Sequence, residues 1–140
     1  MISRIYQQHN ADCLNACVAS MTGLDLTVLN EQCPGPADLQ KFGLFIVEIN
    51  ARNREKGKSA QKLGFAFPVP KDQVYFCKEV IVGTMIADSL FHAVVGEIII
   101  DHGKETVLRI THDPDSNVRI DQLPDTHYNV VSILIVGRTL

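Results

Sequence analysis

The stretch DCLNACVASMTG, residues 12–23, decides how the first part of the chain folds. Its apolar side chains recur at helical spacing, an aspartate precedes them, and Gly23 follows them. An acidic residue at the N-cap and a glycine just after the last turn are common helix boundaries. The sequence therefore predicts a helix that begins at Cys13, with Asp12 as its N-cap, and that buries one face.

Two further helical segments are expected before residue 60. The segment LDLTVLNEQ, residues 24–32, predicts a short turn of helix ahead of the breaker CPGP. Residues 36–56 predict a second full helix, because Pro36 suits a first helical turn and the apolar residues that follow share one helical face. The polar run at residues 50–58 is expected to be its solvated end and the loop after it.

The second half of the chain changes to residue types that favour strands. Four runs rich in β-branched residues lie at 80–86, 93–100, 107–111 and 130–136, separated by turn formers such as DHGK (101–104) and DPDSN (113–117). DHGK predicts a hairpin between the second and third runs, and the apolar run VVSILIV is expected to be central. Helices first and antiparallel strands afterwards predict an α+β domain, with helices packed on one face of the sheet.

Length and charge restrict the class of protein. With 140 residues and 46% hydrophobic content, residues 1–140 are expected to form one domain. The balance of 13 basic against 16 acidic residues, with no basic cluster, argues against a nucleic-acid partner. No apolar run is long enough for a membrane span, and the first residues, MISRIYQQHN, lack the apolar core of a secretory signal peptide. We expect a cytoplasmic protein, or one delivered without such a signal, whose oligomeric state the sequence leaves open.

The cysteines do not follow the spacing of a metal site. They lie at positions 13, 17, 33 and 77. The first pair, C-x3-C, falls inside the predicted helix, and the other two have no partner nearby in sequence, unlike zinc ligands. We expect reduced thiols and neither a metal nor an organic cofactor.

Cys13 is the candidate nucleophile. A cysteine at a helix start faces unsatisfied amides and the positive end of the helix dipole, both of which stabilise the reactive thiolate. Cys17, one turn further, is expected to point toward the sheet and behave as a small hydrophobe. The alternative is that both are ordinary core cysteines.

His92 is the candidate base and Asp113 the residue that orients it. His92 heads the predicted strand HAVVGEIII, whereas His9, His102 and His127 lie in polar connections. If DHGK closes a hairpin, the start of this strand lies beside the end of the next one, where HDP occupies residues 112–114. Asp115 is the alternative if that strand ends later.

These residues resemble a known family. The segment QQHNADCLNACVASMTGL at residues 7–24 is similar to the N-terminal motif of the bacteriocin-processing peptidases, which are papain-superfamily domains that trim double-glycine leader peptides, and of their small stand-alone relatives in bacteria and phages. HAVV at 92–95 resembles that family's catalytic-histidine strand, and HDP its aspartate motif. Glycine usually follows the nucleophile in that family, whereas Leu14 does here.

The resemblance implies a papain-like cysteine hydrolase with a Cys13, His92 and Asp113 triad acting on a peptide or protein amide through a thioester. It also implies that Gln7, six positions before the nucleophile, contributes to the oxyanion hole; Gln8 is the fallback. Three alternatives remain open: a protein glutamine deamidase or transglutaminase on the same scaffold, an inactive papain-like module that binds peptides, and a structural protein with incidental cysteines.

Overall fold

A computed structural model describes residues 4–9, 11–50, 60–62, 74–87, 90–101, 105–120 and 128–138. Its helical elements are α1 (Cys13–Thr22), α2 (Leu26–Gln32) and the 3₁₀ helix η1 (Pro36–Phe42). Its strands are β1 (Leu44–Asn50), β2 (Ala60–Lys62), β3 (Val74–Ala87), β4 (Leu90–Asp101), β5 (Glu105–His112) and β6 (Asn129–Arg138). The described strands form one sheet in the order β1-β6-β3-β4-β5-β2, and every neighbouring pair is antiparallel. The predicted α+β class is therefore confirmed.

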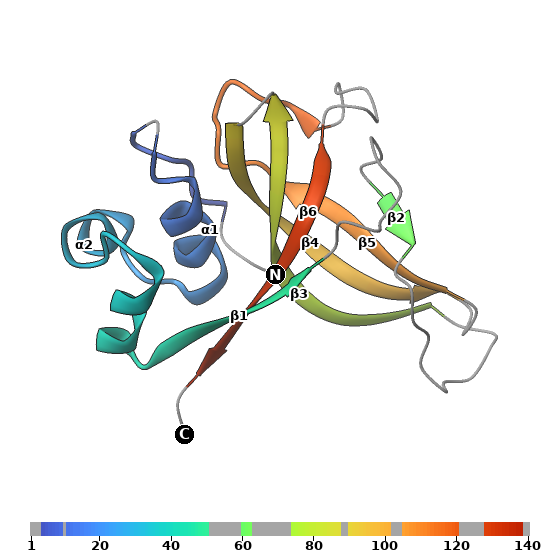
Figure 1. The fold of residues 1–140 in the computed structure, drawn as a ribbon, viewed down its shortest axis with the longest axis horizontal. Helices are drawn as coiled ribbons and strands as arrows, with labels where there is room; N and C mark the ends of the chain where they lie inside the picture. Colours follow the sequence, from blue (N-terminus) through green and yellow to red (C-terminus); the bar gives the residue numbers. More distant parts are fainter. Residues whose placement is uncertain are drawn as a thin grey trace.

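The helices cover one side of a strongly curved sheet (Figure 1). Between them lies a first core, in which Cys17, Val18 and Leu29 of the helices pack with inward residues of the sheet such as Ile81 and Val95. The opposite, concave face of the sheet encloses a second core with members from four strands and from the segment that leads into β6, including Tyr128. The sheet is thus buried on both faces along β3 and β4, which explains their near-continuous apolar sequence.

The helices α1 and α2 form as the sequence predicts, and α1 ends where expected. Gly23 adopts φ 78°, and its N–H donates to the Ala19 carbonyl. This left-handed conformation suits glycine because a side chain there would be strained. Asp12 holds the N-cap position but makes no side-chain cap. Its carboxylate instead accepts hydrogen bonds from the Gln8 and His9 amides and from Asn30, so it shapes the loop before α1.

The predicted helix over residues 36–56 is wrong. The 3₁₀ helix η1 ends after seven residues at Phe42 and is followed by Gly43, which has φ 70°. The chain then becomes β1, where buried Leu44 alternates with exposed Phe45 and Val47. That alternation is the period of a strand, and the β-branched residues of LFIVEIN favour it. The helix prediction failed because a few apolar residues over one short stretch fit the period of a helix as well as that of a strand.

The four predicted strands are confirmed as the central parts of β3, β4, β5 and β6. Each extends beyond its predicted bounds. The hairpin at DHGK is supported by the pairing of Asp101 with Glu105; residues 102–104, with His102, lie outside the described residues, as do residues 51–58 of the predicted polar run. The final run is internal to the sheet, between β1 and β3.

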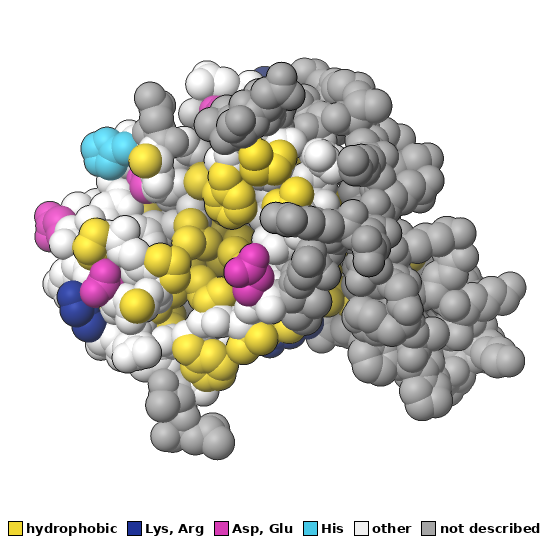
Figure 2. Space-filling model, in the orientation of Figure 1, with side chains coloured by type: hydrophobic (Ala, Val, Ile, Leu, Met, Phe, Trp, Pro, Cys, Tyr) yellow, Lys and Arg dark blue, Asp and Glu magenta, His cyan; other side chains and the backbone are white. Residues whose placement is uncertain are grey.

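The edge strand β1 carries apolar side chains on its outer face. Phe45 and Val47 are 43% and 46% exposed, and Figure 2 shows apolar side chains extending from the helices across this side of the molecule. The Phe45 ring lies over Gly137 of β6, at a position where any Cβ would collide with it. Among the described helices, none is long and apolar enough to cross a bilayer.

Candidate active site

Cys13 is the first residue of α1, and its sulfur points at the sheet. The thiol is buried, with 8% of the residue exposed. The backbone N–H of Ala93 in β4 donates to the sulfur at 3.4 Å, and the Leu14 amide also donates to it. The first bond within the helix runs from the Ala16 N–H to the Asp12 carbonyl. The backbone amides of residues 13–15 therefore have no acceptor within the helix. Among them, the Leu14 amide is the one that donates to the sulfur.

His92 lies next to Ala93 on β4 and connects the sulfur to a carboxylate. Its ring interacts with the Cys13 thiol. Its Nε2 lies 2.7 Å from Oδ1 of Asp113. Since Nε2 is engaged by the carboxylate, Nδ1 is the ring nitrogen left for the sulfur. The structure thus brings together the three residues that the sequence analysis selected, from α1, β4 and the end of β5.

Asp113 is almost completely buried, at 3% exposure, and both of its oxygens are hydrogen-bonded. Oδ1 also accepts from the Asp115 amide at 2.9 Å. Oδ2 accepts from the Tyr128 hydroxyl at 2.6 Å. Asp113 rather than Asp115 therefore contacts His92, and the Asp115 carboxylate serves the next turn by accepting from the Asn117 amide.

Tyr128 is the member of this site that the sequence analysis missed. It is 1% exposed and packs in the second core. A buried tyrosine usually finds a hydrogen-bond partner for its hydroxyl, but nothing in the segment HYNVV (127–131) identifies this partner, which lies 15 residues away in sequence. The signal that the sequence did offer was a tyrosine directly before the apolar run of β6.

A β-bulge brings Asp113 to the correct face of the sheet. In the β4–β5 pair, Gly96 is level with Ile110 but Val95 is level with His112, so Thr111 is the extra residue. With no bulge, continuing the register would set Asp113 beside Ala93, on the helix-covered face. The one-residue shift sets it beside Val94 instead, on the face that His92 shares, because side chains alternate along a strand.

These contacts shift the pKa values of the pair in opposite directions. Burial raises the pKa of the Cys13 thiol, but hydrogen bonds from His92 and the two amides, with the imidazolium charge, lower it below its ordinary value. Burial lowers the pKa of His92, while hydrogen bonds to Asp113 and Cys13 and their charges raise it to about 9. Because the pKa of the thiol is lowered and that of the imidazole is raised to about 9, the site favours a thiolate and an imidazolium over the neutral pair.

The Asp113 carboxyl shows the complementary shift. Burial raises its pKa, but the hydrogen bonds from His92, Tyr128 and the Asp115 amide lower it below its ordinary value. It therefore stays ionised and can stabilise the charged ring. Burial next to Asp113 raises the pKa of Tyr128, so its hydroxyl remains a donor.

Gln7 lies in the segment before α1, and its side chain is partly engaged. Its Nε2 donates to the His9 carbonyl at 2.9 Å, while Oε1 is buried and has no partner among the described residues. Its backbone N–H donates to the Pro114 carbonyl, next to Asp113. Gln8 is exposed, and its amide donates to Thr27 of α2. The contribution of Gln7 to an oxyanion hole stays a prediction.

The two other cysteines whose side chains the structure describes lie in the core. Cys17 is fully buried in the first core, and burial raises its pKa well above the ordinary value. Cys33 is also buried, and the three described thiols are free. His9 is exposed, whereas His127 and the Cys77 side chain lie outside the described residues. Within the part of the chain that the structure describes, no group of three or more His, Cys, Asp or Glu is arranged for a metal.

Comparison of the sequence with models of known protein families finds no match, and comparison with curated protein sequences finds none either.

Proposed function

We propose that this chain is a cysteine hydrolase of papain-like design that cleaves amide bonds in a peptide or protein. One observation carries the proposal: the His92 ring interacts with the Cys13 thiol on one side and is hydrogen-bonded to the Asp113 carboxylate, at 2.7 Å, on the other. A nucleophile at a helix start, a base within reach of it and an acceptor behind the base are the elements of nucleophilic acyl transfer. The order of helix, histidine strand and aspartate also agrees with a papain-like domain.

The mechanism follows from the protonation states. The Cys13 thiolate attacks the carbonyl carbon of the substrate, and His92 delivers its proton to the departing amine. Water, deprotonated by His92, then attacks the thioester and releases the acid and the free thiol. Asp113 keeps the imidazole in the required tautomer and stabilises its charge.

The oxyanion requires donors near Cys13. The Cys13 amide lies at the helix start, and Gln7 supplies a second candidate, since only one of its two side-chain N–H groups is used by His9. The buried Oε1 without a partner is a further argument for a role of Gln7, because such an atom costs about 1–3 kcal/mol and is concentrated at functional sites. A substrate N–H is a suitable donor to it.

The test is an activity-based acyl probe, with mapping of the labelled cysteine by mass spectrometry. We expect label on Cys13 and none on Cys17, and we expect iodoacetamide to alkylate Cys13 well below pH 8. Cys17→Ala is the matched control, since it removes a thiol of the same helix that points into the core. Equal labelling of the four thiols, or a Cys13→Ala variant that keeps its turnover, would remove the basis of the proposal.

The main alternative is a deamidase or transglutaminase that attacks a glutamine side chain through the same three residues. Substrate trials separate the two: mass spectrometry detects cleavage of a peptide bond, a gain of about one mass unit on deamidation, or an attached amine. An inactive peptide-binding module would bind peptides without labelling at Cys13.

A further inference from the structure

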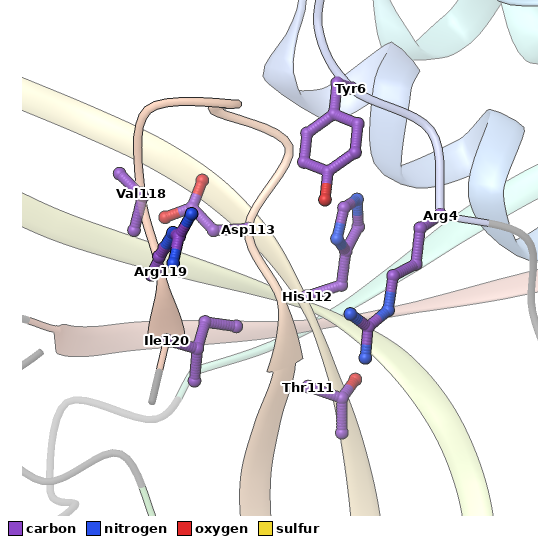
Figure 3. Close-up of a pocket in the computed structure, with 8 residues that line it drawn as sticks. All are labelled: Arg4, Tyr6, Thr111, His112, Asp113, Val118, Arg119 and Ile120. Atoms are coloured by element: carbon purple, nitrogen blue, oxygen red, sulfur yellow. The ribbon is translucent and has the colours of Figure 1, made fainter. Parts of the chain in front are cut away.

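A cavity of about 460 Å³ lies beside Asp113, the carboxylate of the candidate triad. Three segments form its walls: residues 4–6 before α1, residues 111–113 at the end of β5, and residues 118–120 in the following turn (Figure 3). This volume lies within the range of sites for small molecules. Neither the catalytic proposal nor the structural role of these segments accounts for it.

The N-terminal wall of the cavity is fixed by contacts on both sides. The Ile5 N–H donates to Ser20 of α1, and the Ile5 carbonyl accepts from Nε2 of His112 at 2.8 Å. The Gln7 amide is bound to the Pro114 carbonyl. Because an extended chain alternates its side chains, Ile5 packs into the first core while Arg4 and Tyr6 line the cavity. These contacts therefore hold the backbone that carries the exposed side chains of Arg4 and Tyr6 at the cavity.

The cavity carries an excess of positive charge. Arg4 and Arg119 reach it from separate segments (Figure 3), and neither forms an ion pair with another described residue. Asp113 is the acidic residue of the lining, but its oxygens are occupied by His92, the Asp115 amide and Tyr128. Both side chains are exposed, so two guanidinium groups that pair with no described carboxylate lie at one cavity of a chain whose net charge is −3.

The remaining lining residues suit an anion with an organic body. The Tyr6 ring packs edge-on against the His112 ring, with centroids 5.1 Å apart, which leaves its hydroxyl at the cavity. Val118 and Ile120 supply an apolar wall opposite the N-terminal segment. Guanidinium groups pair with the planar or tetrahedral oxygens of carboxylates and phosphates through two parallel hydrogen bonds.

We propose that this cavity binds an oxyanion, a phosphate or carboxylate group of a small ligand, between Arg4 and Arg119. The ligand's uncharged part lies against Val118 and Ile120. Such a group comes either from a phosphorylated small molecule or from a carboxylate such as a peptide C-terminus. The proposal is independent of the hydrolase activity, because binding here does not require Cys13.

The test is a titration of the full chain with each anion, in which NMR monitors the backbone amide chemical shifts. Sodium chloride keeps the ionic strength constant. Inorganic phosphate represents the first source, and N-acetylglycine the second; N-acetylglycinamide, which lacks the charge, is the neutral comparison. We expect saturable shifts around residues 4–6, 111–113 and 118–120 with phosphate or with N-acetylglycine, and none with the amide. Shifts with phosphate alone identify a phosphorylated ligand, and shifts with N-acetylglycine alone identify a carboxylate.

Substitutions then assign the site. Arg4→Gln and Arg119→Gln are each expected to weaken binding about tenfold or more, since each removes a charged hydrogen-bonding partner. Arg138→Gln is the matched control, because Arg138 is an exposed arginine on β6 outside the lining. The proposal is overturned if neither anion gives saturable shifts beyond those of chloride, or if all three variants bind alike.

Discussion

The imidazole of His92 is held from both sides, which makes its charge state the central property of the candidate site. Cys13 contacts it from α1, and Asp113 contacts Nε2 at 2.7 Å. A pKa of about 9 for His92, together with a lowered pKa for Cys13, gives a pH window with its upper limit near 9 in which the ion pair dominates. For the proposed activity we expect a bell-shaped profile of kcat/KM against pH, with its alkaline limb near pH 9.

Asp113→Asn tests the source of that charge stabilisation. The substitution keeps the shape of the side chain but removes the negative charge that raises the pKa of His92. We expect turnover to fall by about 10³–10⁴, the alkaline limb to move to lower pH, and Cys13 alkylation below pH 8 to slow. Alkylation profiles that superimpose on the wild type would contradict the assignment of this carboxylate.

Tyr128→Phe tests the residue behind the carboxylate. Loss of the 2.6 Å hydrogen bond leaves Oδ2 of Asp113 buried without its donor. We expect a loss of about 1–3 kcal/mol in the free energy of unfolding and a shift of Cys13 alkylation to higher pH. Tyr6→Phe is the control, since Tyr6 contacts His112 and not the triad. A purely structural role would lower the stability and leave the pH of alkylation unchanged.

At the level of elements, the bulge between β4 and β5 positions the triad, and Gly96 sits at it. A Cβ on Gly96 would lie 2.8 Å from the Arg109 carbonyl oxygen and 2.8 Å from a methyl of Val82. Since one of these neighbours is backbone, the strands must shift to accommodate it. The position of Asp113 therefore depends on the bulge, and the bulge depends on close packing at Gly96, which a side chain would disturb.

Gly96→Ala is expected to destabilise the fold by about 1–3 kcal/mol, as overpacking does, and to reduce the fast alkylation of Cys13 by moving Asp113 away from His92. Urea unfolding and the alkylation rate measure the two effects. Gly35→Ala is the control, because the nearest atom to its added Cβ is 3.9 Å away and its φ of −140° is open to any residue. Equal unfolding midpoints for both variants would show that the bulge tolerates a side chain.

For the whole molecule, the triad links stability to pH. In the folded wild type, between the lowered pKa of Cys13 and about pH 9, the pair shares one proton, held on His92. The unfolded chain also holds one proton, on the thiol, between about pH 6.5 and about pH 8.5, the ordinary pKa values of histidine and cysteine. Where these two ranges overlap, folding takes up no net proton at these groups, so the triad should give the free energy of unfolding little slope with pH.

Cys13→Ala removes this balance. Asp113 still raises the pKa of His92 in the folded state, so the folded variant binds more protons than the unfolded one above about pH 6.5. A histidine whose pKa is raised by folding stabilises the folded state below the pKa of the unfolded chain. This stabilisation is lost as the pH rises through the folded pKa. We expect the urea midpoint of the variant to fall between about pH 6 and about pH 8.5 more steeply than that of the wild type. Parallel profiles would mean that no thiolate–imidazolium pair forms.

The sequence by itself determined the helix at Cys13, its end at Gly23, the four main strands and the hairpin that brings His92 near Asp113. These features depend on local periodicity and on turn residues, and both involve residues that are close together in the sequence. It did not determine that the chain turns from η1 into β1 after Gly43, since a short apolar run fits a helix as well as an edge strand. Pairing with β6 decides in favour of the strand, because β1 pairs with β6 along its whole length.

Only the tertiary structure decided the face on which Asp113 lies, the role of Tyr128 and the cavity between Arg4 and Arg119. The bulged residue, Thr111, has no local signature, yet the shift of one position moves a side chain across the sheet. Tyr128 and the two arginines are brought to their places by contacts between segments distant in sequence. Such contacts depend on packing across the whole sheet. They cannot be predicted from local patterns in a single sequence, because the residues that make contact are far apart in it.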